Sequence, residues 1–142
     1  MTTDYETDFY QWTQQQAALL RQGLLTDLDY ENLAEEIESM GHSQGDAVRS
    51  FLRNILMHLL KWKHQPERRC VSWELTIDNG RDEIRWRLKK NPSLKPQILL
   101  LVEDAYPQAR KNASRETGLP LATFPEQCPF TIEQITGDYW PD

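Results

Sequence analysis

The sequence lacks the covalent staples and long apolar segments that anchor many small proteins. Its 142 residues include only two cysteines, Cys70 and Cys128, and neither belongs to a CxxC pair of the kind that binds zinc. The longest uninterrupted apolar run, residues 98–102, is far shorter than the roughly 20 residues of a membrane-spanning helix. The N-terminal residues are acidic and do not resemble a signal peptide. We therefore expect a cytoplasmic protein with two free thiols and no contact with a membrane.

Several familiar catalytic motifs are also missing. The chain contains no Walker loop, no GxGxxG motif and no HExxH motif. The sequence therefore favours a protein that is not an enzyme, and it predicts no cofactor.

What the sequence does contain is helical periodicity along nearly its whole length, without strand-like alternation. The predicted helices cover residues 8–22, 30–40, 43–65, 73–90 and 93–117, and a shorter one is capped by Thr131. We expect an all-α fold that forms a single domain over residues 1–142. About five main helices form a bundle within residues 1–118, and the proline-rich segment 119–142 packs on it.

The helix at residues 30–40 carries an apolar stripe that its spacing assigns to the core. The stripe consists of Tyr30, Leu33, Ala34, Ile37 and Met40. Gly41 is predicted to stop this helix and Ser43 to cap the next one. A short turn at Gly41 and His42 would then fold the two helices into a hairpin.

Charge is unevenly distributed within a net charge of −6. Residues 1–48 hold ten acids and one base, whereas residues 49–90 hold eleven bases and five acids. Two interpretations are open: the acidic and basic parts face each other, or the basic part binds an anionic partner.

Three acids follow one flank of the apolar stripe, at Glu31, Glu35 and Glu38. Like charges at this spacing repel by about 0.2–0.5 kcal/mol per pair, so we expect a compensating partner. In the predicted hairpin, Glu35 and Glu38 would meet Arg49 and Arg53 of the facing helix. This ion-pair arrangement is the structural explanation of the charge pattern.

The same acids allow a functional alternative. If the hairpin brings His58 beside Glu35 and Glu38, the three side chains could hold a metal ion or perform acid–base chemistry. The Glu-x-x-His pattern of di-iron bundles does not occur, so the spacing does not require a metal.

Basic and aromatic residues gather between residues 58 and 73. We combine them with the acids into one candidate binding face, which consists of Glu31, Glu35, Glu38, His58, Lys61, Arg68, Arg69 and Trp73. The leading hypothesis is a non-enzymatic interaction or regulatory module whose partner is another protein or a second copy of the chain. A further alternative is weak binding of an anion or nucleic acid by the basic turn 61–69, although the acidic net charge is opposite to the usual nucleic-acid footprint.

Each member of this face also has a structural interpretation. His58 is typical of a partly buried histidine that is satisfied by a neighbouring carbonyl, and Arg68 or Arg69 could cap the preceding helix. The helix at 73–90 is apolar on two sides, with Trp86 opposite the main stripe. We expect it to pack between neighbours; the alternative is an exposed tryptophan that contacts a partner.

An ordered series of motifs resembles one bacterial family. The motifs are DFYQW at 8–12, NLAEEIESMG at 32–41, HLLKW at 58–62, QPERR at 65–69, SW at 72–73, ETGLP at 116–120, FP at 124–125 and CPF at 128–130. Over nearly the whole chain this series is similar to the domain-of-unknown-function family numbered twenty-nine. The resemblance implies a small, cytoplasmic, all-helical protein. It implies no activity, because the family has no established catalytic residues.

Overall fold

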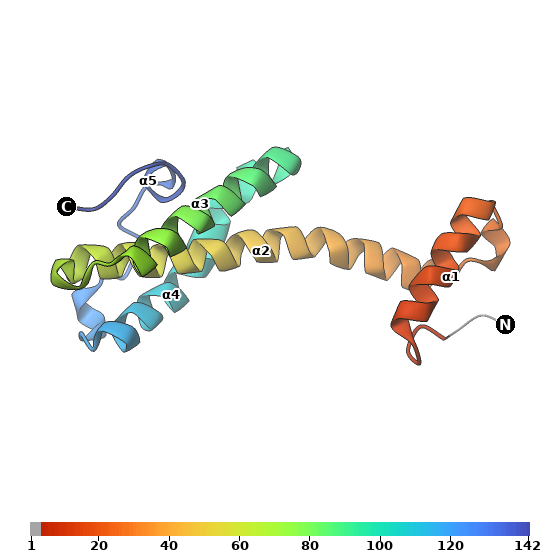
Figure 1. The fold of residues 1–142 in the computed structure, drawn as a ribbon, viewed down its shortest axis with the longest axis horizontal. Helices are drawn as coiled ribbons and strands as arrows, with labels where there is room; N and C mark the ends of the chain where they lie inside the picture. The colour runs from red at the N-terminus through yellow and green to blue at the C-terminus, as the bar shows by residue number, and fades with distance from the viewer. Residues whose placement is uncertain (1–3) are drawn as a thin grey trace. The chain divides into compact units, whose positions relative to one another are not determined.

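The computed structural model describes residues 4–142, which form helices joined by short connections (Figure 1). The α-helices are α1 (Phe9–Gln22), α2 (Tyr30–His64), α3 (Val71–Lys90), α4 (Ile98–Thr117) and α5 (Ile132–Thr136). The 3-10 helices are η1 (Leu25–Asp27), η2 (Pro66–Arg68), η3 (Pro92–Gln97) and η4 (Leu121–Thr123). No strand occurs within these residues, so the all-α prediction is confirmed. None of the described helices is apolar over enough of its length to cross a membrane.

Contacts divide the chain into two compact units. One unit ends at Ser43, and the other runs from Gln44 to Asp142. Because the boundary falls inside α2, the two halves of this helix belong to different units and have different surroundings.

The first unit is organised around the indole of Trp12. Asp8 caps α1 and a left-handed Gly23 ends it, as the sequence predicts. Trp12 is buried, and its Nε1 donates a hydrogen bond of 3.0 Å to the carboxylate of Asp29. The backbone N–H of Asp29 in turn donates to the buried Gln16 side chain at 2.8 Å. Asp29 therefore ties the start of α2 to α1.

Tyr5 makes a second link in this unit. Its ring packs edge-on against Trp12 at 4.7 Å, and its hydroxyl donates to the carboxylate of Glu36 on α2. This hydrogen bond stabilises the protonated hydroxyl and raises the pKa of Tyr5 to about 12.

The predicted hairpin is wrong, because α2 does not break at Gly41. Gly41, His42 and Ser43 lie inside the helix, and the Ser43 hydroxyl donates to the carbonyl of Met40 at 2.7 Å instead of capping a new helix. A glycine inside a helix costs only about 1 kcal/mol relative to alanine. The glycines at this point therefore weaken the helix without ending it.

The main core lies in the second unit, where the apolar stripe of α2 is covered. From α2 the fully buried residues are Val48, Leu52, Ile55, Leu56, Leu59 and Leu60. Across them pack Ile77 and Ile84 of α3 and Val102, Ala105, Ala109 and Ala113 of α4. The two helices α2 and α3 approach closely at Gly80, where a Cβ atom would lie 2.8 Å from Cγ1 of Ile55.

The C-terminal segment packs on this core, as the sequence predicts. Its contribution to the core is Phe124, Phe130 and Ile135, all of them buried. The expected capping box of Thr131 and Gln134 opens α5. Beyond α5, the ring of Trp140 lies 4.8 Å from that of Trp62 on α2.

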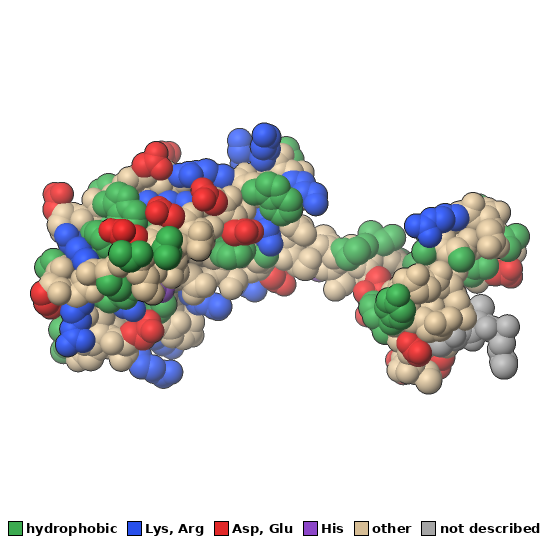
Figure 2. All heavy atoms as spheres, in the orientation of Figure 1, with side chains coloured by type: hydrophobic (Ala, Val, Ile, Leu, Met, Phe, Trp, Pro, Cys, Tyr) green, Lys and Arg blue, Asp and Glu red, His purple; other side chains and the backbone are tan. Residues whose placement is uncertain are grey.

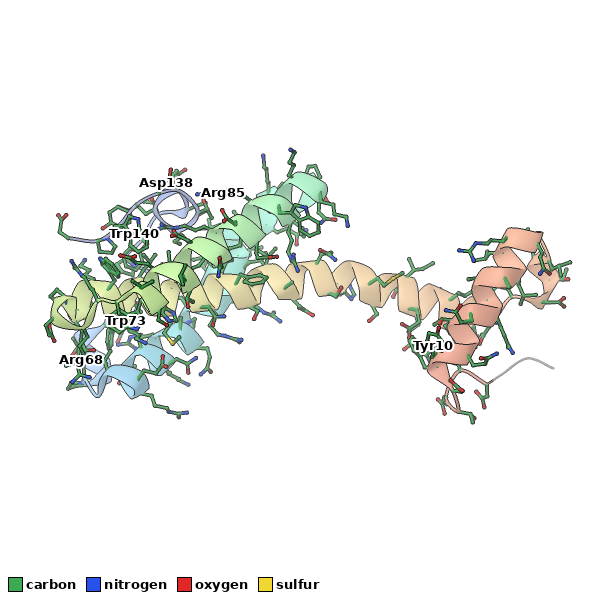
Figure 3. The ribbon with its side chains drawn as sticks, in the orientation of Figure 1. Tyr10, Arg68, Trp73, Arg85, Asp138 and Trp140 are labelled. Atoms are coloured by element: carbon green, nitrogen blue, oxygen red, sulfur yellow. The ribbon has the colours of Figure 1, made fainter. Side chains whose placement is uncertain are left out.

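Arg81 of α3 holds the C-terminal segment in place. Only 2% of its surface is exposed, and its guanidinium donates to the carbonyls of Gln134, Ile135 and Tyr139 at 2.6–2.9 Å. One turn later, Arg85 reaches the same segment through Asp138 at 3.2 Å (Figure 3). The free carbonyls in the last turn of α5 and just after it are thus satisfied by arginine side chains.

Candidate interaction surface

The three acids of the candidate face lie on the first half of α2, exposed to solvent. Glu31, Glu35 and Glu38 make no ion pair with any described residue, so the predicted partners do not meet them. Arg49 instead pairs with Asp46 one turn earlier at 3.0 Å, and Arg53 donates to Ser50 at 3.4 Å. The predicted ion pairs between these acids and Arg49 and Arg53 required the hairpin, so this prediction is also wrong.

The metal alternative required the same hairpin. Within the described residues, no group of three or more His, Cys, Asp and Glu side chains is placed to hold a metal ion. Glu35, Glu38 and His58 are not such a group.

A serine-nucleophile pattern overlaps the same stretch. Residues 41–45 read Gly-His-Ser-Gln-Gly and match GxSxG. That motif is functional where the serine stands on a sharp turn between a strand and a helix. Here Ser43 lies inside α2, and its hydroxyl donates a hydrogen bond to the helix backbone. The match has no catalytic geometry.

The basic members of the candidate face have structural partners in the second unit. Lys61 is buried, with its Nζ 3.4 Å from the Glu116 carboxylate of α4 and 4.6 Å from the ring centroid of Trp73. The Nε of Arg69 donates to the carbonyl of Trp62 at 2.9 Å, and its guanidinium lies over the Trp62 ring. These contacts join α2, α3 and α4 to one another.

Arg68 and His58 differ in exposure. Arg68 lies exposed at the turn between α2 and α3 (Figure 3). His58 is half-buried with Nδ1 2.8 Å from the carbonyl of Asn54, as its structural interpretation expects. Burial disfavours the imidazolium and lowers the pKa of His58.

The main surprise is the apolar stripe that the sequence assigned to the core. We call Tyr30, Leu33, Ala34, Ile37 and Met40 the α2 stripe. Tyr30, Ile37 and Met40 are 60–61% exposed. Hydrophobic side chains with acids beside them are visible along this part of α2 in Figure 2.

The α2 stripe continues the helix face that forms the core. Val48 follows Tyr30, and Ile55 follows Ile37, by an interval of about five helical turns, so each pair shares one direction. Val48 and Ile55 are fully buried, whereas Tyr30 and Ile37 are not. Apolar residues of the same helical periodicity are therefore buried in the second unit and exposed in the first.

Trp86 provides a second exposed apolar group, on α3. It is 55% exposed, so the expectation that it packs between neighbours is wrong. Arg87 and Lys90 lie over its ring at 5.4 and 5.1 Å. Trp86 therefore has the exposure that the alternative interpretation, a tryptophan that contacts a partner, requires.

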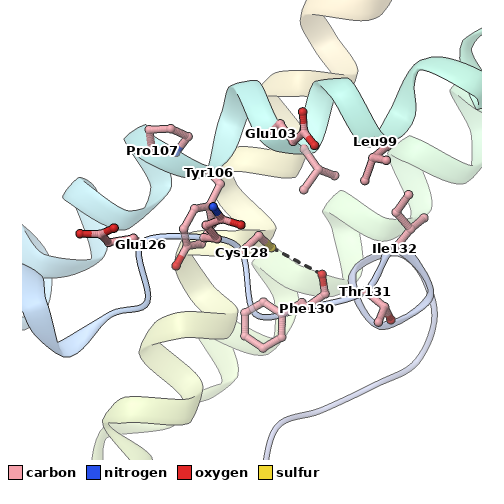
Figure 4. Close-up of a pocket in the computed structure, with 11 residues that line it drawn as sticks. Leu99, Glu103, Tyr106, Pro107, Glu126, Cys128, Phe130, Thr131 and Ile132 are labelled. Carbon is pink, nitrogen blue, oxygen red and sulfur yellow. Dashed lines mark hydrogen bonds between the residues drawn. The ribbon is translucent and has the colours of Figure 1, made fainter.

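A cavity of about 380 Å³ lies between α4 and the C-terminal segment (Figure 4). Two of its polar groups have partners: the Tyr106 hydroxyl donates to the carbonyl of Pro125 at 2.6 Å, and the Cys128 thiol faces the carbonyl of Phe130 at 3.6 Å. Burial raises the pKa of Tyr106 to about 12 and that of Cys128 above its usual value. Both groups therefore stay protonated at neutral pH, and neither is an activated nucleophile.

Taken with the helical fold, these observations define the class: an all-helical protein whose uncovered apolar face is its most distinctive surface. A family model described as Domain of unknown function DUF29 matches residues 5–140, and the chain belongs to this family. The family is one of unknown function, so membership brings no activity with it. Neither a comparison with curated proteins nor one with solved structures finds a match.

Proposed function

We propose that this protein is a non-enzymatic helical interaction module that binds another protein through the α2 stripe. The observation that supports this function is the change of exposure along one helix face, from fully buried at Val48 and Ile55 to about 60% exposed at Tyr30, Ile37 and Met40. Apolar side chains at three- and four-residue spacing are the usual anchors of helix-to-helix recognition.

The energetic gain from covering the stripe is substantial. Complete burial of a Leu, Ile or Met side chain contributes about 1.5–3 kcal/mol. Ile37 and Met40 retain some 60% of their surface, so each would contribute about 1–2 kcal/mol on binding. Tyr30 and the half-buried Leu33 extend the same contact by one turn.

The proposal uses three of the eight candidate residues, Glu31, Glu35 and Glu38, as the polar rim of the stripe. Most of the remainder, His58, Lys61, Arg69 and Trp73, have intramolecular contacts that account for them. We take the protein to be bacterial and cytoplasmic, and the two free cysteines fit a reducing compartment.

The test compares a stripe variant with a matched surface variant. The stripe variant carries Ile37→Gln and Met40→Gln; the control carries Leu75→Gln and Leu100→Gln, which are 54% and 62% exposed on α3 and α4. Because all four side chains are exposed, both proteins should retain the wild-type helical circular dichroism. Tagged proteins are used to capture partners from native lysate.

The expected result is a defined protein that copurifies with the wild type and the control but not with the stripe variant. Identical captured proteins for all three baits would contradict the proposed function.

A further inference from the structure

We infer that the partner of the α2 stripe is a basic amphipathic helix, an inference that rests on the function proposed above. The stripe itself specifies only an apolar contact. The chemistry around it specifies the charge of the occupant.

The charge around the stripe is strongly negative and uncompensated. Glu31, Glu35 and Glu38 form one row on α2, spaced by about one helical turn, and Glu31 and Glu38 border the stripe on the side of Ala34. All three are exposed, and none has an ion-pair or hydrogen-bond partner among the described residues. Between residues 4 and 43 the chain holds nine acids and a single base, Arg21. An approaching partner therefore meets a negative field that favours cations.

The geometry fits a helix that lies along α2. The apolar row and the acidic row run parallel over residues 30–40, which span about 15 Å at 1.5 Å per residue. A partner helix of roughly three turns matches this length. With apolar residues at three- and four-residue spacing and Lys or Arg on the flank nearest Ala34, it would bury the stripe and bring cations close to Glu31 and Glu38.

A second copy of this chain is a poorer occupant. Pairing two α2 stripes would bring two rows of exposed glutamates to one interface, and like charges across an interface oppose association. The acidic flank thus selects against self-pairing while it selects for a basic partner.

The probe is a synthetic 18-residue amphipathic peptide with Leu at helix-face spacing and Lys on both flanks. One comparison peptide replaces every Lys by Glu, and another keeps the Lys composition in scrambled order. Binding to the full chain is measured by fluorescence anisotropy at low and at physiological salt. The charge variant carries Glu31→Gln, Glu35→Gln and Glu38→Gln. Its matched control carries three exposed acids of the second unit changed in the same way, Glu67→Gln, Glu74→Gln and Glu103→Gln.

We expect the Lys peptide to bind the wild type and the control equally, and the charge variant roughly fivefold more weakly, because the exposed charge pairs with Glu31 and Glu38 are lost. Binding should weaken with salt, and the Glu and scrambled peptides should not bind.

Three outcomes would overturn the inference, and they separate it from the proposed function. If the Lys and Glu peptides bind equally and only the variant with Ile37→Gln and Met40→Gln loses both, the stripe is a binding surface but its partner is not basic. If the stripe variant binds the Lys peptide as tightly as the wild type, both proposals fail. If sedimentation equilibrium finds a wild-type dimer that the stripe variant does not form, the occupant is a second copy.

Discussion

Replacing the two glycines of α2 near the boundary of the units, Gly41 and Gly45, should stabilise this helix. An added Cβ at Gly41 or Gly45 would meet no atom within 4 Å. Both glycines have helical neighbours on each side, so alanine should fit without strain. Glycine costs about 0.8–1.0 kcal/mol relative to alanine in a helix interior. Gly41→Ala with Gly45→Ala should therefore stabilise this part of α2 by about 2 kcal/mol.

Native-state hydrogen exchange measures this gain where it arises. Peptides that cover residues 38–48 should exchange roughly 30-fold more slowly in the double variant, since 1.4 kcal/mol corresponds to a factor of ten. The matched control is Gly80→Ala, the same change in another helix interior. There the new Cβ would lie 2.8 Å from the fully buried Ile55, and overpacking of about 1–3 kcal/mol should outweigh the gain in helix propensity.

A turn at Gly41 would respond in the opposite way, because alanine disfavours the left-handed conformation that stops a helix. Unchanged or faster exchange in the double variant would refute an uninterrupted α2.

Three further predictions concern the second unit. Arg81→Met should lower the free energy of unfolding by about 3–4 kcal/mol, because three carbonyls lose a charged donor; guanidinium unfolding measures this, and a loss below about 1 kcal/mol would show that the contacts are incidental. Lys61→Met should lower the free energy of unfolding by less than about 1 kcal/mol in the same assay. The methionine side chain fills the space over the Trp73 ring, and the half-exposed carboxylate of Glu116 is solvated by water once it has lost its partner. Folding lowers the pKa of His58, so its unfolded form binds a proton first as pH falls below about 6.5. Wild-type stability should therefore fall relative to His58→Gln as the pH drops from the unfolded pKa to the folded one, and level off below it; parallel melting-temperature profiles of the two proteins would exclude this linkage.

Local signals in the sequence were sufficient to predict those helix ends that are set by a capping side chain or a glycine. Asp8 and Gly23 bound α1, and Thr131 with Gln134 opens α5, because these residues satisfy terminal backbone groups within a few positions. The packing of the C-terminal segment was also predictable, because an irregular segment with several large apolar residues needs a core to cover them.

The break in α2 was mispredicted because Gly41 and Ser43 imitate a stop followed by a cap. Both residue types are tolerated inside a helix at modest cost, and here the neighbouring turns outweigh it. The predicted ion pairs of Glu35 and Glu38 with Arg49 and Arg53 depended on the hairpin and failed with it.

The solvent exposure of an apolar helix face could not be predicted from the spacing of its residues. A three- and four-residue spacing identifies the apolar face of a helix, but not whether another element covers it. For that reason the α2 stripe and Trp86 were both assigned to the interior. Arg81 was not identified from the sequence, although its position carries a signal. It lies four residues after Ile77 and three before Ile84, and this spacing places it on the buried face of α3.

The most direct test of the central claim is methyl NMR of the full chain, labelled at Ile and Met and titrated with the Lys peptide. Binding at the α2 stripe predicts that the Ile37 and Met40 methyl resonances shift to saturation, while those of the fully buried Ile55 and Ile84 stay in place. Saturation of the protein without a change at Ile37 and Met40 would contradict it.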